Sequence, residues 1–205
     1  MTPGATKMQP ARRRGRPSEV DPREVAKVAL REFEARGVDE VTMDEVAKAA
    51  GISRRTLFRL FPSKTDLVWE GLDQMLAATR QRIEALGSVR RPLHEVVERV
   101  LFPTLALLDD PEWASLARRR LKLIASSLAL LNHRTMSELQ ALLTEAIART
   151  VEPLDQPASL VANTLVSVGF SSILWWATTG SQLAPADALR ASFAAVALAT
   201  PLRRP

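Results

Sequence analysis

The sequence of 205 residues contains no cysteine and no tyrosine, and it has only two histidines. A chain without cysteine can form neither a disulfide framework nor a thiolate metal site, and this composition fits a cytoplasmic protein. His94 and His133 lie far apart, and neither belongs to an HxxxH or HExxH motif. We therefore expect no metal site in this chain.

The motifs of common catalytic centres are also missing. The sequence has no glycine-rich loop that would cradle a phosphate, no Ser-His-Asp arrangement and no cysteine nucleophile. We therefore expect no catalytic residues, no cofactor and no enzymatic activity. An enzyme with a helical body remains an alternative, which turnover of an added acyl-CoA would support.

The net charge of +5 is unevenly distributed along the chain. Residues 1–64 carry 14 lysines and arginines against 9 acidic residues, whereas residues 65–205 carry 14 of each. The whole excess therefore lies in the N-terminal third, where it favours a polyanionic partner such as DNA. An unrelated basic tail would give the same count over residues 1–20.

No stretch alternates apolar and polar residues as a strand does, and no Asn-Gly or Asp-Gly hairpin turn occurs. Apolar residues instead recur at steps of three and four, which is typical of amphipathic helices. We predict an all-α fold of about nine helices. The expected helical ranges are 21–36, 42–50, 54–61, 64–86, 92–108, 111–124, 133–151, 158–179 and 185–199, with Pro103 kinking the fifth and a less regular link at 125–132.

The segment 42–64 reads as two short helices joined by a tight turn. Thr42 and Glu45 have the spacing of a capping box. Gly51 allows the left-handed backbone that ends a helix, and Ser53 is placed to cap the next one, which Pro62 then stops.

The second helix of this pair has two different faces. Leu57, Leu60 and Phe61 fall on one side, while Arg55 and Arg59 fall on the other. Arginine on an exposed helix can donate to guanine or to phosphates in the major groove. A solvated basic face is the alternative, but the preceding helix, the turn and the basic segment upstream favour a helix-turn-helix.

Residues 42–67 resemble the TetR family of transcriptional regulators. In that family the third helix reads bases and the start of the fourth holds a phosphate. The resemblance implies that Arg54, Arg55 and Arg59 contact bases and that Thr42, Thr56 and Lys64 contact phosphates, with Ser53 and Phe58 beside them. The residues that carry it are Thr42, Met43, Glu45, Val46, Ala47, Ala50, Gly51, Ile52, Ser53, Thr56, Leu57, Phe58, Phe61, Lys64 and Leu67.

Two positions depart from the family pattern. Phe58 stands where tyrosine is usual, and Leu60 stands where histidine or tyrosine is often found, so neither can make a polar contact. The run from Ser53 to Trp69 resembles the branch that includes mycofactocin-system regulators, whose effectors are long-chain acyl-CoA thioesters. By this resemblance a basic cluster would bind the phosphates of such a ligand, and a solvated helix face is the alternative. The cluster consists of Arg118, Arg119, Arg120 and Lys122.

We predict three parts of the chain. Residues 1–20 form a basic arm that is disordered when free, residues 21–66 a three-helix DNA-binding head, and residues 67–205 a helical effector-binding and dimerisation body. The basic residues of the arm are expected to follow the duplex, either in the minor groove or through phosphates: Arg12, Arg13, Arg14 and Arg16.

The resemblance implies a small hydrophobic effector held between the fourth and eighth helices, and a dimer through the last two. The candidate wall residues are Trp69, Leu72, Leu76, Phe102, Leu105, Trp113, Leu116, Phe170, Ile173 and Trp176, each of which can also be plain core. A dimer implies a palindromic operator. The sequence predicts a repressor released by its effector, with an activator, a regulator without effector and a membrane-associated adaptor as alternatives.

The adaptor hypothesis rests on residues 156–186, which contain no charge. This segment is long enough to span a bilayer, but polar residues interrupt it and small residues suit close helix contact. We therefore interpret it as a helix inside a subunit interface. The N-terminal stretch is polar and basic, so no secretory signal is expected.

Overall fold

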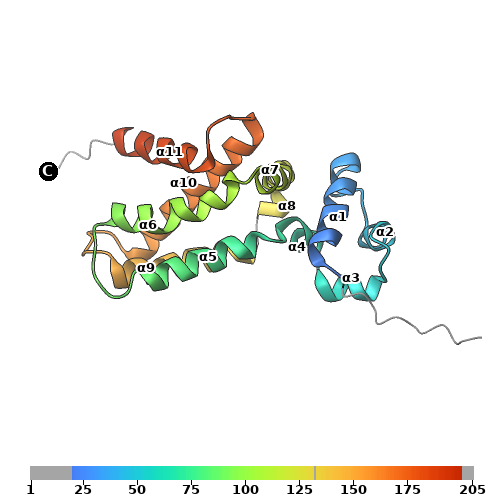
Figure 1. The fold of residues 1–205 in the computed structure, drawn as a ribbon, viewed down its shortest axis with the longest axis horizontal. Coiled ribbons are helices and arrows are strands. Elements are labelled where there is room, and N and C mark those ends of the chain that lie inside the picture. The colour runs from blue at the N-terminus through green and yellow to red at the C-terminus, as the bar shows by residue number, and fades with distance from the viewer. Residues whose placement is uncertain (1–19, 132, 200–205) are drawn as a thin grey trace, which may run out of the picture.

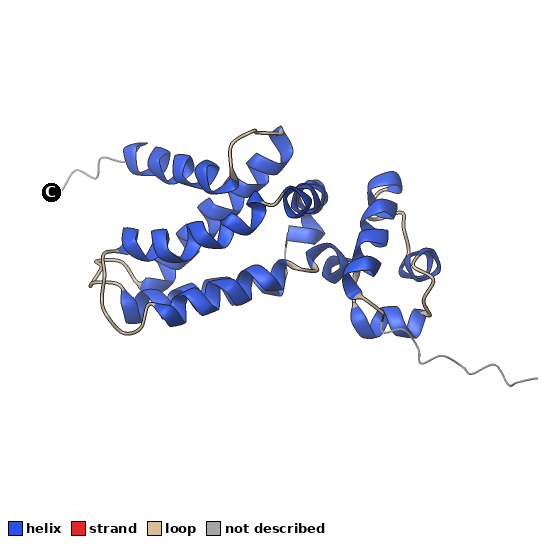
Figure 2. Ribbon diagram, viewed as in Figure 1, coloured by secondary structure: helices blue, strands red, loops and turns tan. Residues whose placement is uncertain are grey.

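A computed structural model of the chain describes residues 20–131 and 133–199, and these form an all-α structure, as predicted (Figures 1 and 2). Within these residues there are eleven α-helices, one 3-10 helix and a single isolated bridge between Arg91 and Val151. The helices are α1 (Pro22–Arg36), α2 (Met43–Ala49), α3 (Arg54–Leu60), α4 (Lys64–Trp69), α5 (Leu72–Ala85), α6 (Leu93–Leu105), η1 (Ala106–Asp109), α7 (Pro111–Ser126), α8 (Leu128–Leu131), α9 (Arg134–Thr150), α10 (Ala158–Thr179) and α11 (Pro185–Ala199).

Helices α1, α2 and α3 form a small unit at one end of the molecule (Figure 1). The caps predicted for the helix pair are present. Thr42 and Glu45 form a complete capping box, and the backbone N–H of Thr56 donates to the Ser53 hydroxyl at 3.1 Å. Buried side chains of α1, among them Leu30 and Phe33, pack against the pair. Local sequence signals therefore determine this part of the fold.

The longer helices form the rest of the molecule. In Figure 1, α5, α6 and α9 run side by side, with α10 behind them and α11 at the outer edge. Helix α10 packs on α9, α7 and α11. One buried cluster continues from α1 through α4 and α7 to α10, and a second joins α5, α6, α9 and α10. The unit formed by α1, α2 and α3 and the rest of the molecule therefore share a continuous core across α4.

The prediction of one helix over residues 64–86 is wrong. The helix ends at Trp69, Glu70 adopts an extended backbone, and Gly71 has a φ of 83°. Glycine adopts this left-handed conformation without steric cost, which an ordinary helical pattern does not reveal. The link between the two ends of the molecule is therefore a joint between α4 and α5 and not a rigid rod.

Two smaller expectations also need correction. The link at 125–132 contains the short helix α8; together with the division into α4 and α5, this gives eleven α-helices in the described residues where nine were predicted. Pro103 lies inside α6, which ends two residues later and continues as the 3-10 helix η1. Proline removes one helical hydrogen bond and crowds the preceding turn, which agrees with the early end of this helix.

Replacing Gly71 with alanine is expected to lower the free energy of unfolding by about 2 kcal/mol or more, because a Cβ would meet both a left-handed backbone and a packed side chain. An ideal Cβ at this position lies 3.1 Å from Nη1 of Arg120. Gly87, with a φ of 66° and open space around it, is the matched control and should lose only about 1 kcal/mol. Denaturant unfolding of both variants measures the difference; equal losses would show that Arg120 does not restrict the joint.

Candidate DNA-binding surface and ligand cavity

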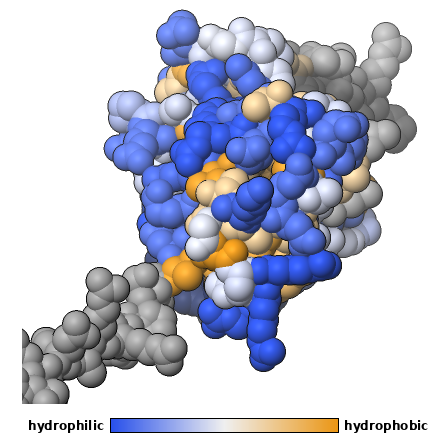
Figure 3. Space-filling model, turned by 90° about the vertical axis from the view of Figure 1, so that its right-hand side faces the viewer, coloured by the Kyte–Doolittle hydropathy of each residue, from blue (hydrophilic) through white to orange (hydrophobic). Residues whose placement is uncertain are grey.

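Helix α3 turns its apolar side inward and its basic side outward. Leu57 and Phe61 are buried, Leu60 is half-buried against the same core, and Arg55 and Arg59 are exposed. Across residues 20–131 and 133–199, neither arginine takes part in an ion pair or a side-chain hydrogen bond. Figure 3 views the molecule from this end, where the surface is mainly hydrophilic. Both guanidinium groups are thus available to an external acceptor.

Arg54 differs from its two neighbours on α3. Its Nη1 lies 3.0 Å from Oδ2 of Asp44 on α2, and its guanidinium lies 5.3 Å from the ring centroid of Phe58. Phe58 itself is 38% exposed, as expected for a surface position. Arg54 therefore joins α2 to α3 in the free protein, and only Arg55 and Arg59 are presented without an internal partner.

The residues predicted to contact phosphates have internal partners as well. The Thr42 hydroxyl donates to Glu45 Oε2 at 2.8 Å, and the hydroxyls of Ser53 and Thr56 lie 2.8 Å apart. Lys64 donates to the carbonyl oxygen of Val38 at 2.7 Å. Hydroxyl oxygens retain capacity for a further contact. The Lys64 ammonium ties α4 to the loop after α1, a role that the sequence did not indicate.

The basic excess of the N-terminal third lies mostly outside the described residues. Residues 20–64 carry nine lysines and arginines against eight acidic residues. The arginines of the predicted arm, 12 to 14 and 16, lie outside the part of the chain that the structure describes. Attraction of the described surface to DNA therefore depends on where its arginines point and not on net charge.

The capping box makes the stability of this unit dependent on pH. Hydrogen bonds from the Thr42 backbone N–H, the Arg36 guanidinium and the Thr42 hydroxyl lower the pKa of Glu45 to about 2 from an ordinary 4.5. The depressed pKa means that the carboxylate stabilises the fold above pH about 4.5 and that this contribution is lost as the pH falls toward 2.

Replacing Glu45 with glutamine is therefore expected to destabilise the protein at neutral pH and to have progressively less effect in acid. The difference in unfolding free energy between the native protein and the variant should be constant above pH about 5 and shrink below the unfolded pKa. Chemical denaturation at a series of pH values measures it. A difference that stays unchanged down to pH 3 would contradict the assignment.

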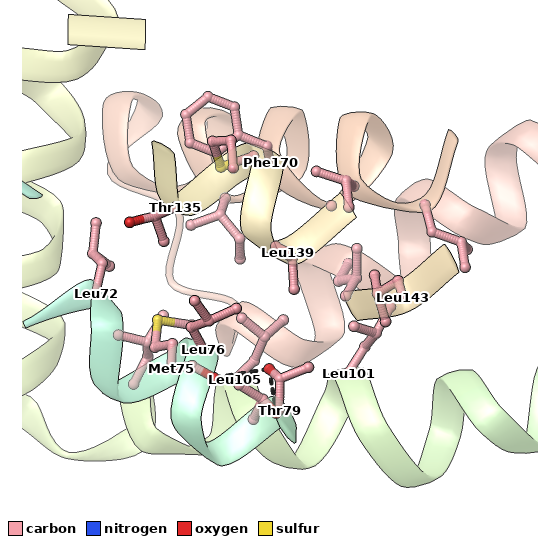
Figure 4. Close-up of a pocket in the computed structure, with 18 of the residues that line it drawn as sticks. Leu72, Met75, Leu76, Thr79, Leu101, Leu105, Thr135, Leu139, Leu143 and Phe170 are labelled. Atoms are coloured by element: carbon pink, nitrogen blue, oxygen red, sulfur yellow. Dashed lines mark hydrogen bonds between the residues drawn. The ribbon is translucent and has the colours of Figure 1, made fainter. Parts of the chain in front are cut away.

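The body contains an apolar cavity of about 150 Å³. Figure 4 shows that Met75 and Leu76 from α5, Leu105 from α6, Leu139 from α9 and Phe170 from α10 point toward it. The described residues that line it include no charged side chain. Its polar groups are three threonine hydroxyls: Thr79, Thr104 and Thr135.

All three hydroxyls are already bonded within the protein, that of Thr135 through a contact of 2.9 Å with Nδ1 of His133. Thr79 donates to the Met75 carbonyl oxygen at 2.8 Å, and Thr104 donates to that of Val100 at 2.7 Å. A hydroxyl whose proton is committed in this way can only accept from a ligand. The cavity therefore suits a molecule that is apolar over most of its surface.

The structure brings most of the predicted wall residues together. Trp69, Leu72, Leu76, Leu105, Phe170 and Ile173 line the cavity. The other four predicted residues do not line this cavity. Phe102 packs edge-on against Phe193, Trp176 is buried beneath Arg118, Leu116 packs on the core, and Trp113 lines a separate, smaller cavity. Size and hydrophobicity alone do not separate cavity walls from core.

The three arginines of α7 each have a partner within the protein. Arg118 donates to the carbonyl oxygens of Trp176 and Ser181 at 2.7 and 2.6 Å. Arg119 forms a two-pronged ion pair with Glu34 of α1, with both contacts at 2.7 Å. Arg120 is buried against Glu70. Of the predicted cluster only Lys122 is exposed, so these three arginines hold α7 to three other elements.

Sequence reasoning missed one group beside the cavity. The His133 ring stacks on Trp69, with centroids 4.9 Å apart, and its Nε2 lies 3.4 Å from Oδ1 of Asp66 on α4. Contacts with Ser63 and His133 lower the pKa of Asp66 despite partial burial. His133 was expected at a helix end, and it does cap α9, but its tertiary contacts have no signature in the sequence.

Helices α2 and α3 are short, capped and joined by a glycine turn, and α1 packs against them. Helix α3 presents arginines to solvent. This arrangement defines a helix-turn-helix protein. The sequence profile of the bacterial regulatory proteins of the tetR family matches residues 26–70, which span this unit. The N-terminal unit of the chain therefore resembles that of the bacterial regulatory proteins of the tetR family.

Two curated relatives agree with this assignment. A protein of Mycobacterium tuberculosis proposed to be a mycofactocin biosynthesis transcriptional regulator, MftR, is 36% identical over 74 residues, covering 36% of this chain and 37% of the relative. The uncharacterised HTH-type transcriptional regulator YhgD of Bacillus subtilis is 31% identical over 81 residues, covering 40% and 42%. The similarity therefore spans about two fifths of each relative.

A solved structure extends the likeness to the body. The structure of NalD, the secondary repressor of the MexAB-OprM multidrug efflux pump in Pseudomonas aeruginosa, covers 84% of this chain and 94% of its own, with a TM-score of 0.56 and 20% identity. At this identity the likeness concerns the fold alone, and the function of the body has to be argued from its own residues.

Proposed function

We propose that this protein is a dimeric DNA-binding transcriptional regulator, a repressor released from a palindromic operator by a small hydrophobic effector. The observation that carries the proposal is α3, whose buried Leu57 fixes the helix with Arg55 and Arg59 facing outward. Arginine in this position can make paired hydrogen bonds to guanine in the major groove. Both curated relatives are named as transcriptional regulators, which supports the same activity.

The dimer is proposed from α10 and α11. Helix α10 is long and apolar enough to cross a membrane, yet only 17% of the residues in its most apolar stretch are buried within the chain. Leu160 and Trp175 are 53% and 49% exposed. Such a face is stable in water only when it is covered, and a second copy would cover it through a two-fold contact.

A membrane is the weaker explanation of this face. The exposed side of α10 also carries Asn163, Thr164 and Ser167, which a lipid contact would leave without water. Among the small residues expected at the interface, Ala162 and Ala177 are buried within the protomer, while Ala191, Ala194 and Ala195 on α11 are exposed. We therefore assign the interface mainly to the outer sides of α10 and α11.

The effector is proposed from the cavity. Helix α5 forms part of the cavity wall and follows directly after the joint at Gly71, beyond which α4 leads to the DNA-binding unit. A ligand that fits the cavity in only one position of α5 would shift the balance between two arrangements of the heads. An acyl-CoA is less favoured than a compact ligand, because the described residues in the wall of the cavity of about 150 Å³ include no charged side chain to meet the phosphates of coenzyme A.

The proposal is tested by selecting genomic fragments with the purified protein and footprinting the enriched sites. The expected result is protection of a palindrome of two half-sites about one helical turn apart. A reporter placed behind that site distinguishes a repressor from an activator. Absence of any enriched sequence would contradict the proposed function, whatever the cavity binds.

A further inference from the structure

A second cavity of about 100 Å³ lies beside the apolar one. The two cavities share five wall residues, namely Leu72, Met75, Leu108, Ala117 and Leu121. Flexible, unbranched side chains such as methionine adapt readily to an added ligand. A single molecule can therefore extend from one cavity into the other when these side chains move.

The second cavity differs from the first because it is polar on one side. Its wall adds Gln74 and the guanidinium of Arg120, which is only 3% exposed. This guanidinium lies under the joint, with Nη1 3.1 Å from the position of a Cβ on Gly71. Guanidinium groups only donate hydrogen bonds and match the geometry of a carboxylate. The polar end of a ligand here has to be an acceptor.

Arg120 is held by a carboxylate of the protein. Its Nη2 donates to Oε2 of Glu70 at 2.9 Å, and the Glu70 side chain is 15% exposed. A second anion added to this pair would leave an excess negative charge at low dielectric, which is costly. Glu70 follows the last turn of α4, directly before Gly71, and its side chain is partly exposed, so it can turn toward water and leave Arg120 to another carboxylate.

Resting on the proposed function, we propose that the effector is a hydrophobic carboxylic acid. Its apolar part fills the main cavity, and its carboxylate enters the second cavity and replaces Glu70 on Arg120. The exchange breaks the contact that holds the last residue before Gly71 to α7. The charged end of the ligand thereby acts on the joint between the body and the DNA-binding unit.

The volumes suggest the size of a suitable probe. An apolar cavity of roughly 150 Å³ accommodates a benzene-sized ligand, so the two cavities together suit a molecule of about ten non-hydrogen atoms. Octanoate has this size and is ionised at neutral pH. Octanamide has the same shape and an acceptor oxygen but no charge, and it is the matched neutral probe.

The test is calorimetric titration of octanoate and octanamide into the native protein and three variants. Glu70→Gln keeps the shape of the side chain and removes the competing charge, so octanoate should bind about 10-fold tighter or more, with octanamide changed by less than about 3-fold. Combining Glu70→Gln with Arg120→Gln should remove the preference for the acid. Glu34→Gln, which removes the partner of the neighbouring Arg119, should change neither affinity.

The inference is overturned if the Glu70→Gln variant binds octanoate no better than the native protein does, or if the acid preference persists without Arg120. Equal binding of both probes, with release of the operator by both, would remove the carboxylate site and leave the proposed regulator intact. Failure of octanoate to bind the Glu70→Gln variant also overturns the inference, and footprinting without ligand then still tests DNA binding. Glu70→Gln keeps the size and shape of the side chain. The measurement on this single variant therefore tests the inference even if the double variant does not fold.

Discussion

Replacing Arg55 and Arg59 together with alanine is expected to weaken binding to the operator by on the order of 10³-fold or more. Each arginine that pairs with a base edge contributes about 1–3 kcal/mol, and a dimer presents both arginines twice. Both side chains are exposed on α3, so their removal should leave the fold unchanged. Fluorescence anisotropy on the selected operator measures the loss, and unfolding curves verify the fold.

Two single replacements serve as controls for this experiment. Arg80→Ala removes an equally exposed arginine from α5, far along the chain from α3, and should change operator affinity by less than about 2-fold. Arg54→Ala should have an intermediate effect, because its guanidinium is paired with Asp44 in the free protein. If the double variant kept both its affinity and its sequence preference, α3 would not be the helix that lies in the groove.

The part of the fold that could be predicted is the part governed by local signals. A capping residue at Thr42, a glycine at 51 and a capping residue at Ser53 each act on their nearest neighbours in sequence. The apolar spacing of Leu57 and Phe61 then decides which side of α3 faces the core. Both ends of α10 and the start of α11 were predicted correctly for the same reason, since a proline or glycine marks each of them.

The joint at Gly71 could not be predicted, because its cause lies elsewhere in the chain. A lone glycine within a helical pattern is often tolerated. Here the chain turns at this glycine, where the guanidinium of Arg120, about fifty residues later, packs so closely that Nη1 lies 3.1 Å from the position of a Cβ. The run Arg118–Arg120 also looked uniform in sequence, yet its three side chains reach three different partners.

The cavity was only partly predictable for a related reason. Periodicity identifies residues that face inward, but it does not distinguish a filled core from a hollow one. Phe102 and Trp176 are buried by Phe193 and Arg118, which contact them from other helices, whereas Trp69 and Phe170 border open space. Packing between distant helices makes this difference.

Replacing Trp175 with arginine is expected to dissociate the proposed dimer. The indole is 49% exposed on α10, the same helix that exposes Leu160 nearer its N-terminus. A two-fold contact brings both copies of the position into one interface, so two unpaired charges would be buried together at a cost of several kcal/mol. Light scattering after size exclusion at micromolar concentration should show a monomer where the native protein is a dimer.

The same replacement should weaken operator binding by about 10²-fold or more, because two linked half-site contacts become independent ones. Val89→Arg is the matched control: Val89 is 64% exposed in the loop between α5 and α6, so the same charge is added where no partner is proposed. This control should remain dimeric and bind DNA normally. Two results would contradict the assignment of α10 and α11 to the interface: a monomeric native protein, or a dimer that survives Trp175→Arg with full operator affinity. Either result would favour the membrane hypothesis for the exposed apolar face. Solubility of the purified protein without detergent then tests that hypothesis.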